Sequence, residues 1–293
     1  MKVIIDTDPG IDDAIALLYA LRHPAIKVIA LTTVAGNIGL PVTTRNAGRI
    51  CAQAGVAPPI HAGAAAPLGK EASPEIMVHG NDGLGGVVFP DPVAPPQSHD
   101  AVGAMARVLA AYPPHTVDLL CLGPLTNLAL LLQHEPQAAA RIGRVIAMGG
   151  AIDEGGNVGP KAEFNIAHDP HAAAKVFAAQ LPLTLIPLDA TRQFRANANY
   201  VKTLTDSGKA AAIAAAALID AYFAATDGME SRPLHDPCVP LMALHPDHFR
   251  TEMRMLDVDI DTGALVEGPH RVMVAMGLDA DPLRAALLQG LSC

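Results

Sequence analysis

The amino-terminal segment constrains the fold of this chain more than any other. A short apolar run, Val3-Ile4-Ile5, is typical of a buried strand, and helical periodicity begins soon after it. Four carboxylates fall within eight residues at this junction: Asp6, Asp8, Asp12 and Asp13. So many acids at one strand end repel each other, so we expect a positive group among them. A hard divalent cation is the simplest candidate.

The rest of the chain alternates between strand-like and helix-like segments. The predicted strands are 3–5, 28–33, 60–61, 116–122, 144–148 and 183–187, followed by an antiparallel pair, 253–260 and 271–276. The predicted helices are 11–21, 41–54, 99–111, 125–134, 170–179, 196–226 with a break at Ser207-Gly208, 235–244 and 280–289.

This alternation predicts an α/β fold with a doubly wound, mostly parallel sheet flanked by helices, similar to an open Rossmann-like sheet. Residues 63–97 are rich in Gly, Pro and Ala and show little periodicity, so we expect a long loop at the active site. No clear linker is present, and we expect residues 1–293 to form a single domain.

Composition excludes several classes of function. Apolar residues make up 51% of the chain and charged residues 17%, which suits a globular protein with buried parallel strands. The formal net charge is −9 and no Lys/Arg cluster is present, so we expect no nucleic-acid partner. No apolar stretch approaches the roughly 18 residues that a membrane helix needs, and we expect no membrane association.

The cysteines and the amino terminus indicate the compartment. Four cysteines lie far apart, at positions 51, 121, 238 and 293, without a C-x-x-C pair. That spacing is typical of reduced, buried thiols. Acidic residues begin at Asp6, where a signal peptide would have its apolar region. We therefore expect a cytoplasmic protein.

The ligand types indicate which cation the carboxylates would bind. No Cys/His cluster has zinc spacing, and oxygen ligands favour Ca²⁺ or Mg²⁺. The segment is not an EF-hand, because the twelfth residue from Asp6 is Leu17 rather than Glu. An alternative is that Asp12 and Asp13 only cap a helix, where the dipole favours negative charge.

Other predicted strand and helix ends add polar groups that a doubly wound fold would gather around one crevice. They are Thr32 to Asn37, Leu122 to Asn127, Ala147 to Gly150, Glu163 with Asn165, and His235-Asp236. Each has a structural alternative. Gly36 and Gly123 could serve turns alone, Asn127 could cap its own helix, and His235 could be a surface or core histidine.

Taken together, these motifs resemble the inosine–uridine nucleoside hydrolase family. They match in order from residue 3 to about residue 245, and the first and last together are highly specific. The matching segments are Asp6-Thr-Asp8-Pro-Gly-Ile-Asp12-Asp13-Ala, Thr-Thr-Val-Ala-Gly-Asn37, Val-His79-Gly-Asn-Asp-Gly-Leu-Gly, Ala-Met148-Gly-Gly, Ala-Glu163-Phe-Asn165-Ile and Leu-His235-Asp236-Pro-Cys.

The resemblance implies an N-glycosidase that hydrolyses ribonucleosides to base and ribose with one bound Ca²⁺ per subunit. By motif position, Ca²⁺ would be held by the carboxylates of Asp8, Asp13 and Asp236 and by the Leu122 carbonyl. Asp8 would also take the proton from the metal-bound water, which Asn37 would help to orient. The positions implied to contact the ribonucleoside are Asp12, Asn37, Met148 through its backbone, Asn157, Glu163, Asn165 and Asp236.

The leaving-group acid and the base preference remain open. His235 resembles a residue proposed as the acid in some members, and His79 in the long loop is a rival. The chain has no Trp for stacking on a base. Tyr222 and Phe223 could substitute, with core packing as the alternative. The region 257–271 looks shorter than is usual in the family, so the sequence does not predict purine or pyrimidine preference.

Two further functions are compatible with the same residues. One is a Mg²⁺-dependent phosphohydrolase that uses Asp6 or Asp8 as nucleophile, although no paired downstream Lys is apparent. The other is a non-catalytic, Ca²⁺-dependent protein that binds nucleosides or ribose. For the enzyme, the resemblance implies a homodimer or a homotetramer whose partner molecule is a small ribonucleoside substrate.

Overall fold

The computed structural model describes residues 1–69, 80–224 and 231–293 of the chain. Its strands are β1 (Lys2–Thr7), β2 (Lys27–Thr33), β3 (Ile60–Ala62), β4 (Val117–Cys121), β5 (Val145–Met148), β6 (Leu183–Ile186), β7 (Arg195–Asn197), β8 (Ser231–Pro233), β9 (Phe249–Val258), β10 (Leu265–Glu267) and β11 (His270–Leu278).

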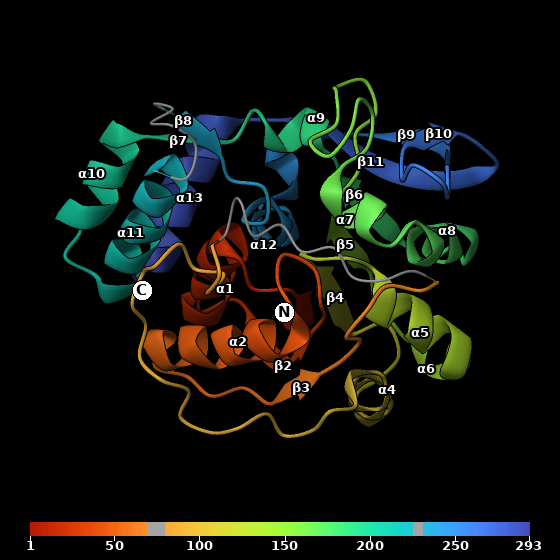
Figure 1. The fold of residues 1–293 in the computed structure, drawn as a ribbon, viewed down its shortest axis with the longest axis horizontal. Helices are drawn as coiled ribbons and strands as arrows, with labels where there is room; N and C mark the ends of the chain where they lie inside the picture. The colour runs from red at the N-terminus through yellow and green to blue at the C-terminus, as the bar shows by residue number, and fades with distance from the viewer. Residues whose placement is uncertain (70–79, 225–230) are drawn as a thin grey trace.

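Helices fill most of the connections between these strands (Figure 1). They are α1 (Ile11–Arg22), α2 (Leu40–Ala54), α4 (Ala101–Ala111), α5 (Thr126–His134), α6 (Pro136–Ala139), α7 (Phe164–His168), α8 (Pro170–Ala178), α9 (Leu188–Thr191), α10 (Ala198–Asp206), α11 (Ala210–Ala224), α12 (Cys238–Leu244), the 3₁₀ helix η1 (Pro246–His248) and α13 (Ala280–Leu291).

The strands of the main sheet lie in the order β10-β9-β11-β6-β5-β4-β1-β2-β3. From β3 to β11 all neighbours are parallel, and β9 and β10 add an antiparallel edge. The chain moves outward from β1 to β2 and β3, then returns to the other side of β1 through β4 and β5. The predicted doubly wound, mostly parallel sheet is confirmed.

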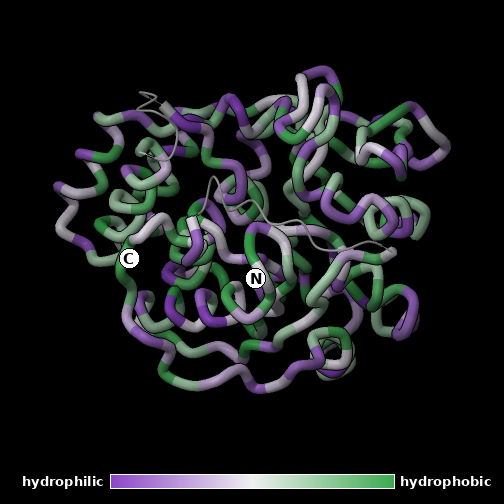
Figure 2. Tube along the Cα trace, viewed as in Figure 1, coloured by the Kyte–Doolittle hydropathy of each residue, from purple (hydrophilic) through white to green (hydrophobic). Residues whose placement is uncertain are grey.

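Helices cover both faces of the sheet, which explains why its strands are apolar on both sides. Val3 and Ile5 of β1 point into the cluster formed with α1, α11, α12 and α13. Ile4, between them, points into the opposite cluster, which contains residues of α4, α5 and α8. Hydrophobic residues concentrate along the strands and the inner helices (Figure 2).

The structure confirms the predicted break at Ser207-Gly208, because α10 ends at Asp206 and α11 begins at Ala210. Gly208 has a φ of 68°, a left-handed conformation that favours glycine. The predicted antiparallel pair is also present, as β9 and β11. Residues 63–69 and 80–97, the described parts of the predicted loop, contain neither helix nor strand.

Several short elements were not predicted, although the short strand β3 was. The four- and five-residue helices α6, α7 and α9 lack a measurable hydrophobic period, and β7 and β8 have three residues each. The last two form a separate two-stranded antiparallel sheet. This small sheet and α9 both flank the cavity described below.

The order of the strands places a crevice at the carboxyl ends of β1 and β4. Connections leave β1 and β4 in opposite directions along the sheet, so they do not cover the gap between these two strands. Asp6 pairs in register with Thr32 of β2 and with Cys121 of β4, so β1 ends level with both neighbours. In the described residues, no helix is both long and apolar enough to span a bilayer.

Candidate functional site

Asp8, Asp12 and Asp13 lie in the connection from β1 to α1 and in the first turn of α1. All three are buried, and Asp236, just before α12, is buried beside them. One carboxylate oxygen from each of Asp12, Asp13 and Asp236 falls within 4.8 Å of the others. The predicted meeting of the amino-terminal acids with Asp236 is therefore present in the folded chain.

Asp13 is fixed by hydrogen bonds on both of its carboxylate oxygens. Oδ1 accepts from the Thr7 hydroxyl at 2.6 Å and from the Asp8 amide at 3.2 Å. Oδ2 accepts from the Gly10 amide at 3.0 Å and from Asn37 Nδ2 at 2.9 Å. Asp13 thus accepts a hydrogen bond from the backbone amide at the start of α1, and it also lies in the acidic cluster. One residue therefore occupies both the predicted helix-capping position and the predicted ligand position.

Asp8 has one bonded and one unbonded oxygen. Oδ2 accepts from the Asn37 amide at 2.7 Å, whereas Oδ1 is buried and has no partner among the described residues. A Cβ added at Gly36 would lie 2.1 Å from Oδ2, and one added at Gly123 would lie 2.1 Å from Oδ1. The two glycines therefore leave space for this carboxylate. They do more than form turns, which was the structural alternative for them.

Burial and mutual repulsion perturb these acids strongly. Burial, then the Asp13 charge, raises the pKa of Asp8 well above its ordinary value. The same two causes raise the pKa of Asp12 to about 7. Burial and the charges of Asp12, Asp13 and Asp8 raise the pKa of Asp236. A hard cation would relieve this repulsion, and the unbonded Asp8 Oδ1 supplies an oxygen for it, so the residues fit the expected metal.

A second layer of polar groups lies below the cluster. Asp6 Oδ1 accepts from Thr32 Oγ1 at 2.6 Å and from Asn127 Nδ2 at 2.8 Å. Asn127 also donates to the Thr33 carbonyl and accepts from the Ala64 amide. Helix α5 begins without a side-chain cap, so Asn127 does not cap its own helix. It instead joins the ends of β1 and β2 and the start of the long loop.

A cavity of about 340 Å³ opens above the acidic cluster. Predicted site residues line it together with residues that were not predicted. The predicted ones are Asp12, Asn37, Leu122, Met148, Asn157, Glu163, Asn165, Tyr222, His235 and Asp236. The unpredicted ones are Val158, Phe164, Leu188, Arg192, Arg195, Arg232 and Pro233. Asp8 and Asp13 lie beneath this lining, and His79 lies outside the described residues.

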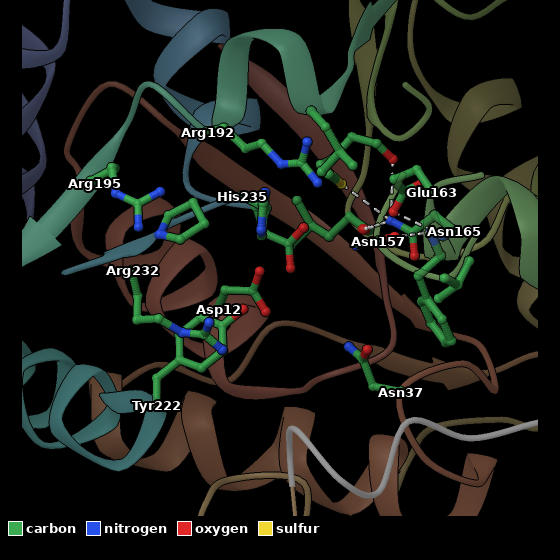
Figure 3. Close-up of a pocket in the computed structure, with 17 residues that line it drawn as sticks. Asp12, Asn37, Asn157, Glu163, Asn165, Arg192, Arg195, Tyr222, Arg232 and His235 are labelled. Carbon is green, nitrogen blue, oxygen red and sulfur yellow. Dashed lines mark hydrogen bonds between the residues drawn. The ribbon is translucent and has the colours of Figure 1, made fainter. Parts of the chain in front are cut away.

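Glu163 and Asn165 form one wall of the cavity, near Asn157 (Figure 3). Glu163 begins α7 and accepts from the amides of Asn165, Ile166 and Gly150. Burial raises its pKa to about 7, although these hydrogen bonds act in the opposite direction. Asn165 Nδ2 donates to the Leu122 carbonyl at 2.7 Å and to the Met148 carbonyl at 3.2 Å.

His235 lies on the other side of the cavity, near Arg192 and Arg195 (Figure 3). Its Nδ1 is 2.7 Å from the hydroxyl of Thr191, the last residue of α9, which fixes the ring. Tyr222 is almost completely buried but lines the cavity. Phe223 is partly buried and packs against the core, in agreement with its core-packing alternative.

The sequence contained a signal for some of the residues that were missed. Arg192 follows the end of β6 by six residues, and the ends of parallel strands were already used to find polar groups. Arg232 stands three residues before His235, outside the matched motif. Thr191 had no such signal, because its contact with His235 joins the end of the short helix α9 to the segment between β8 and α12, and their packing has no sequence pattern.

The raised pKa values predict how stability depends on pH when no divalent cation is bound. Asp6, Asp12 and Glu163, each with a pKa of about 7 in the fold, keep protons that the unfolded chain releases above roughly pH 4. Each contributes stability that is full at low pH and is lost as pH rises towards 7, on the order of 3 to 4 kcal/mol. In a chelator, the free energy of unfolding should therefore fall as the pH rises from about 4 to about 7. Denaturant titrations measure it, added Ca²⁺ should weaken the fall, and a constant or rising value would contradict the prediction.

Comparisons with known proteins identify the relatives of this chain. The family model for the inosine-uridine preferring nucleoside hydrolase matches residues 3–285. The pyrimidine-specific ribonucleoside hydrolase RihA of Salmonella paratyphi C is 39% identical over 88% of this chain and 84% of that protein. The non-specific ribonucleoside hydrolase RihC of Salmonella schwarzengrund is 33% identical over 100% and 98% of the two chains.

The fold has close relatives among solved structures. A purine-preferring ribonucleoside hydrolase from Gardnerella vaginalis superposes with a TM-score of 0.93 at 28% identity, covering 100% of this chain and 98% of that one. The sequence matches and this likeness extend over the sheet, the acidic cluster and the cavity. The chain belongs to the inosine-uridine preferring nucleoside hydrolase family, whose relatives named above are ribonucleoside hydrolases.

Proposed function

We propose that this protein hydrolyses the N-glycosidic bond of ribonucleosides, releasing free base and ribose, with Ca²⁺ at the acidic cluster. The observation that carries the proposal is the set of buried carboxylates at the end of β1, facing the polar wall of Glu163 and Asn165 across one cavity. The named relatives act on pyrimidine nucleosides, on purine nucleosides or on both, so the proposal concerns the ribonucleoside class.

The carboxylates of Asp8, Asp13 and Asp236 and the carbonyl of Leu122 would hold the Ca²⁺. The group of three whose oxygens lie within 4.8 Å contains Asp12 in place of Asp8, and we assign Asp8 to the cation because its buried Oδ1 has no partner among the described residues. When bound, the cation offsets the repulsion among these acids and lowers the pKa of a water that attacks the sugar.

Asp8 is the proposed base that takes the proton from the attacking water. Its Oδ2 is held by the Asn37 amide, and its Oδ1 has no partner among the described residues, so a lone pair is available for the proton. Asn37 Nδ2 donates to the Asp8 carbonyl and to Asp13 Oδ2. Asn37 therefore fixes both acids relative to the water, whichever base the substrate carries.

The ribose would lie between Asp12 and the wall of Asn157, Glu163 and Asn165, where carboxylate oxygens can accept hydrogen bonds from sugar hydroxyls. Departure of the base leaves an oxocarbenium-like sugar, and the nearby carboxylates stabilise its positive charge. Three backbone amides hold Glu163 in place. The grip on the hydroxyls is therefore organised before the substrate binds.

Recognition of the hydroxyls predicts discrimination against deoxyribonucleosides. A site that hydrogen-bonds a hydroxyl leaves its own polar groups unpaired when that hydroxyl is missing, so kcat/KM should fall at least ~100-fold for 2′-deoxyuridine or 2′-deoxyinosine. A panel of ribo- and deoxyribonucleosides, scored by reducing sugar released, measures this. Prolonged chelation should abolish release, and Ca²⁺ should restore it.

Three outcomes of that panel would contradict the proposal. Equal turnover of ribo- and deoxy-substrates would remove the hydroxyl grip. Tight ribose binding without release of base would indicate a binding protein. Hydrolysis of p-nitrophenyl phosphate, without cleavage of any nucleoside, would indicate a phosphohydrolase.

The space around Asp8 gives a second prediction. The substitution Gly36→Ala places a methyl group 2.1 Å from Asp8 Oδ2 and must move that carboxylate. A shift of about 1 Å in a catalytic group costs ~100-fold in kcat. Gly39→Ala is the matched control, because its nearest atom, Pro41 Cδ, is 3.9 Å away. Steady-state rates of both variants test this, and equal rates would show that the position of Asp8 is not critical.

The contact between Thr191 and His235 favours His235 as the acid that protonates the leaving base. His235→Ala should lower kcat on a purine nucleoside by ~100-fold or more and leave p-nitrophenyl riboside little affected, because an activated leaving group needs no acid. The same comparison with His79→Ala tests the rival residue. Equal losses on both substrates would assign His235 to structure instead.

A further inference from the structure

Three arginines line the cavity of a chain whose net charge is −9. In Figure 3, Glu163, Asn157 and Asn165 gather on one side. Arg195, Arg232 and Tyr222 lie on the other side, with Asp12 between the two groups. Arg192 and Arg195 follow β6, whereas Arg232 belongs to β8. The side of the cavity away from the proposed ribose grip is therefore cationic.

The arginines differ in what they already bind. Arg192 forms an ion pair with Glu154 at 2.9 Å and donates to the Gly156 carbonyl at 2.9 Å, so it supports the segment that leads to Asn157. Arg195 lies on β7, where its register partner is Pro233 of β8. The Arg192 side chain therefore has a structural role that does not require a ligand, whereas Arg195 contributes its backbone to the small sheet.

Arg232 has an aromatic contact and, among the described residues, no ionic partner. Its guanidinium carbon lies 4.3 Å from the centroid of the Tyr222 ring. Within the described part of the chain, its Nε is buried without a hydrogen-bond partner, and no carboxylate lies within 4.0 Å of its nitrogens. The residue nevertheless lines the cavity, and a guanidinium that lies close to an aromatic ring is suited to bind a planar anion through its N–H groups.

A simpler role for Arg232 is to compensate the negative charge of the acidic cluster. Burial raises the pKa of Tyr222, the charges of Asp12 and Asp236 raise it further, and the charge of Arg232 lowers it. All three charged groups therefore lie near this ring. However, neither acid is ion-paired with Arg232, and in the proposed function Ca²⁺ already offsets the cluster. Tyr222 supplies an aromatic surface on the same side of the cavity as Arg232. These features are typical of a site for the edge of a heterocyclic base.

We infer that Arg232 is a specificity-determining residue, and that the preferred substrates are ribonucleosides whose base carries a negative charge near neutral pH. The inference rests on the proposed function and names its substrate class. The charge can be a ring carboxylate or an ionised imide, because both present a planar anion to the two N–H groups on one side of a guanidinium. Arg232 then binds the base before cleavage and the free base after it.

Matched substrate pairs test the inference. Orotidine differs from uridine by a carboxylate, and xanthosine differs from inosine by a second carbonyl oxygen on the purine, which makes a ring N–H acidic. The protein should give a higher kcat/KM for the charged member of at least one pair, which also identifies the kind of anion. Arg232→Gln should lower that value by ~10- to ~100-fold, the effect of losing a charge-assisted hydrogen bond, and change the neutral member little.

Arg271→Gln is the matched control, because Arg271 is an exposed residue of β11, outside the cavity lining. It should leave both members of each pair unchanged. Calorimetric titration of orotate and uracil into the protein and into the Arg232→Gln variant measures binding without turnover. Only orotate should lose affinity in the variant.

Several results would overturn the inference. Cleavage of uridine or inosine with no preference for the charged partner would reject it and leave the proposed function intact. Equal losses on both members of a pair in Arg232→Gln would assign Arg232 to charge compensation or structure. A selective loss for uridine 5′-monophosphate would show that Arg232 binds phosphate. Failure to cleave any ribonucleoside would reject the proposed function, and the titrations would still decide whether Arg232 binds an anionic base.

Discussion

The repulsion among buried carboxylates at the end of β1 governs the rest of this structure. Folding brings Asp236 from a distant part of the chain into contact range of Asp12 and Asp13, and burial raises the pKa of Asp236 and Asp12. Without a counter-charge, the fold favours their protonated forms, which are poor ligands and poor bases. A divalent cation bound here would therefore serve stability and reactivity through the same charge.

Close packing of the backbone against these side chains fixes the positions of the carboxylates in the site. Gly36 and Gly123 leave space for the two oxygens of Asp8, and backbone amides hold Asp13 and Glu163. The groups proposed to react are thus attached to the rigid edge of a parallel sheet, where small displacements are costly.

The sequence predicted what depends on local pattern and on chain order. The apolar run after Met1, the helical period from Ile11 and the strand alternation were sufficient to predict the doubly wound sheet and to bring the acids to one edge. It did not reveal the contact of Thr191 with His235 or that of Arg232 with the Tyr222 ring. Each contact involves at least one short element with no periodicity, α9 or β8, so only tertiary packing determines it.

The sheet formed by β7 and β8 stands apart from the nine-stranded sheet, yet it contributes Arg195 and Arg232 to the cavity. Most groups proposed to bind sugar and cation lie on or near the main sheet, although Asp236 follows β8 by three residues. Substitutions of the two arginine side chains would therefore alter which heterocycle is accepted and leave the proposed groups of the main sheet in place. Such a division lets selection diversify one property of an enzyme while the other is preserved.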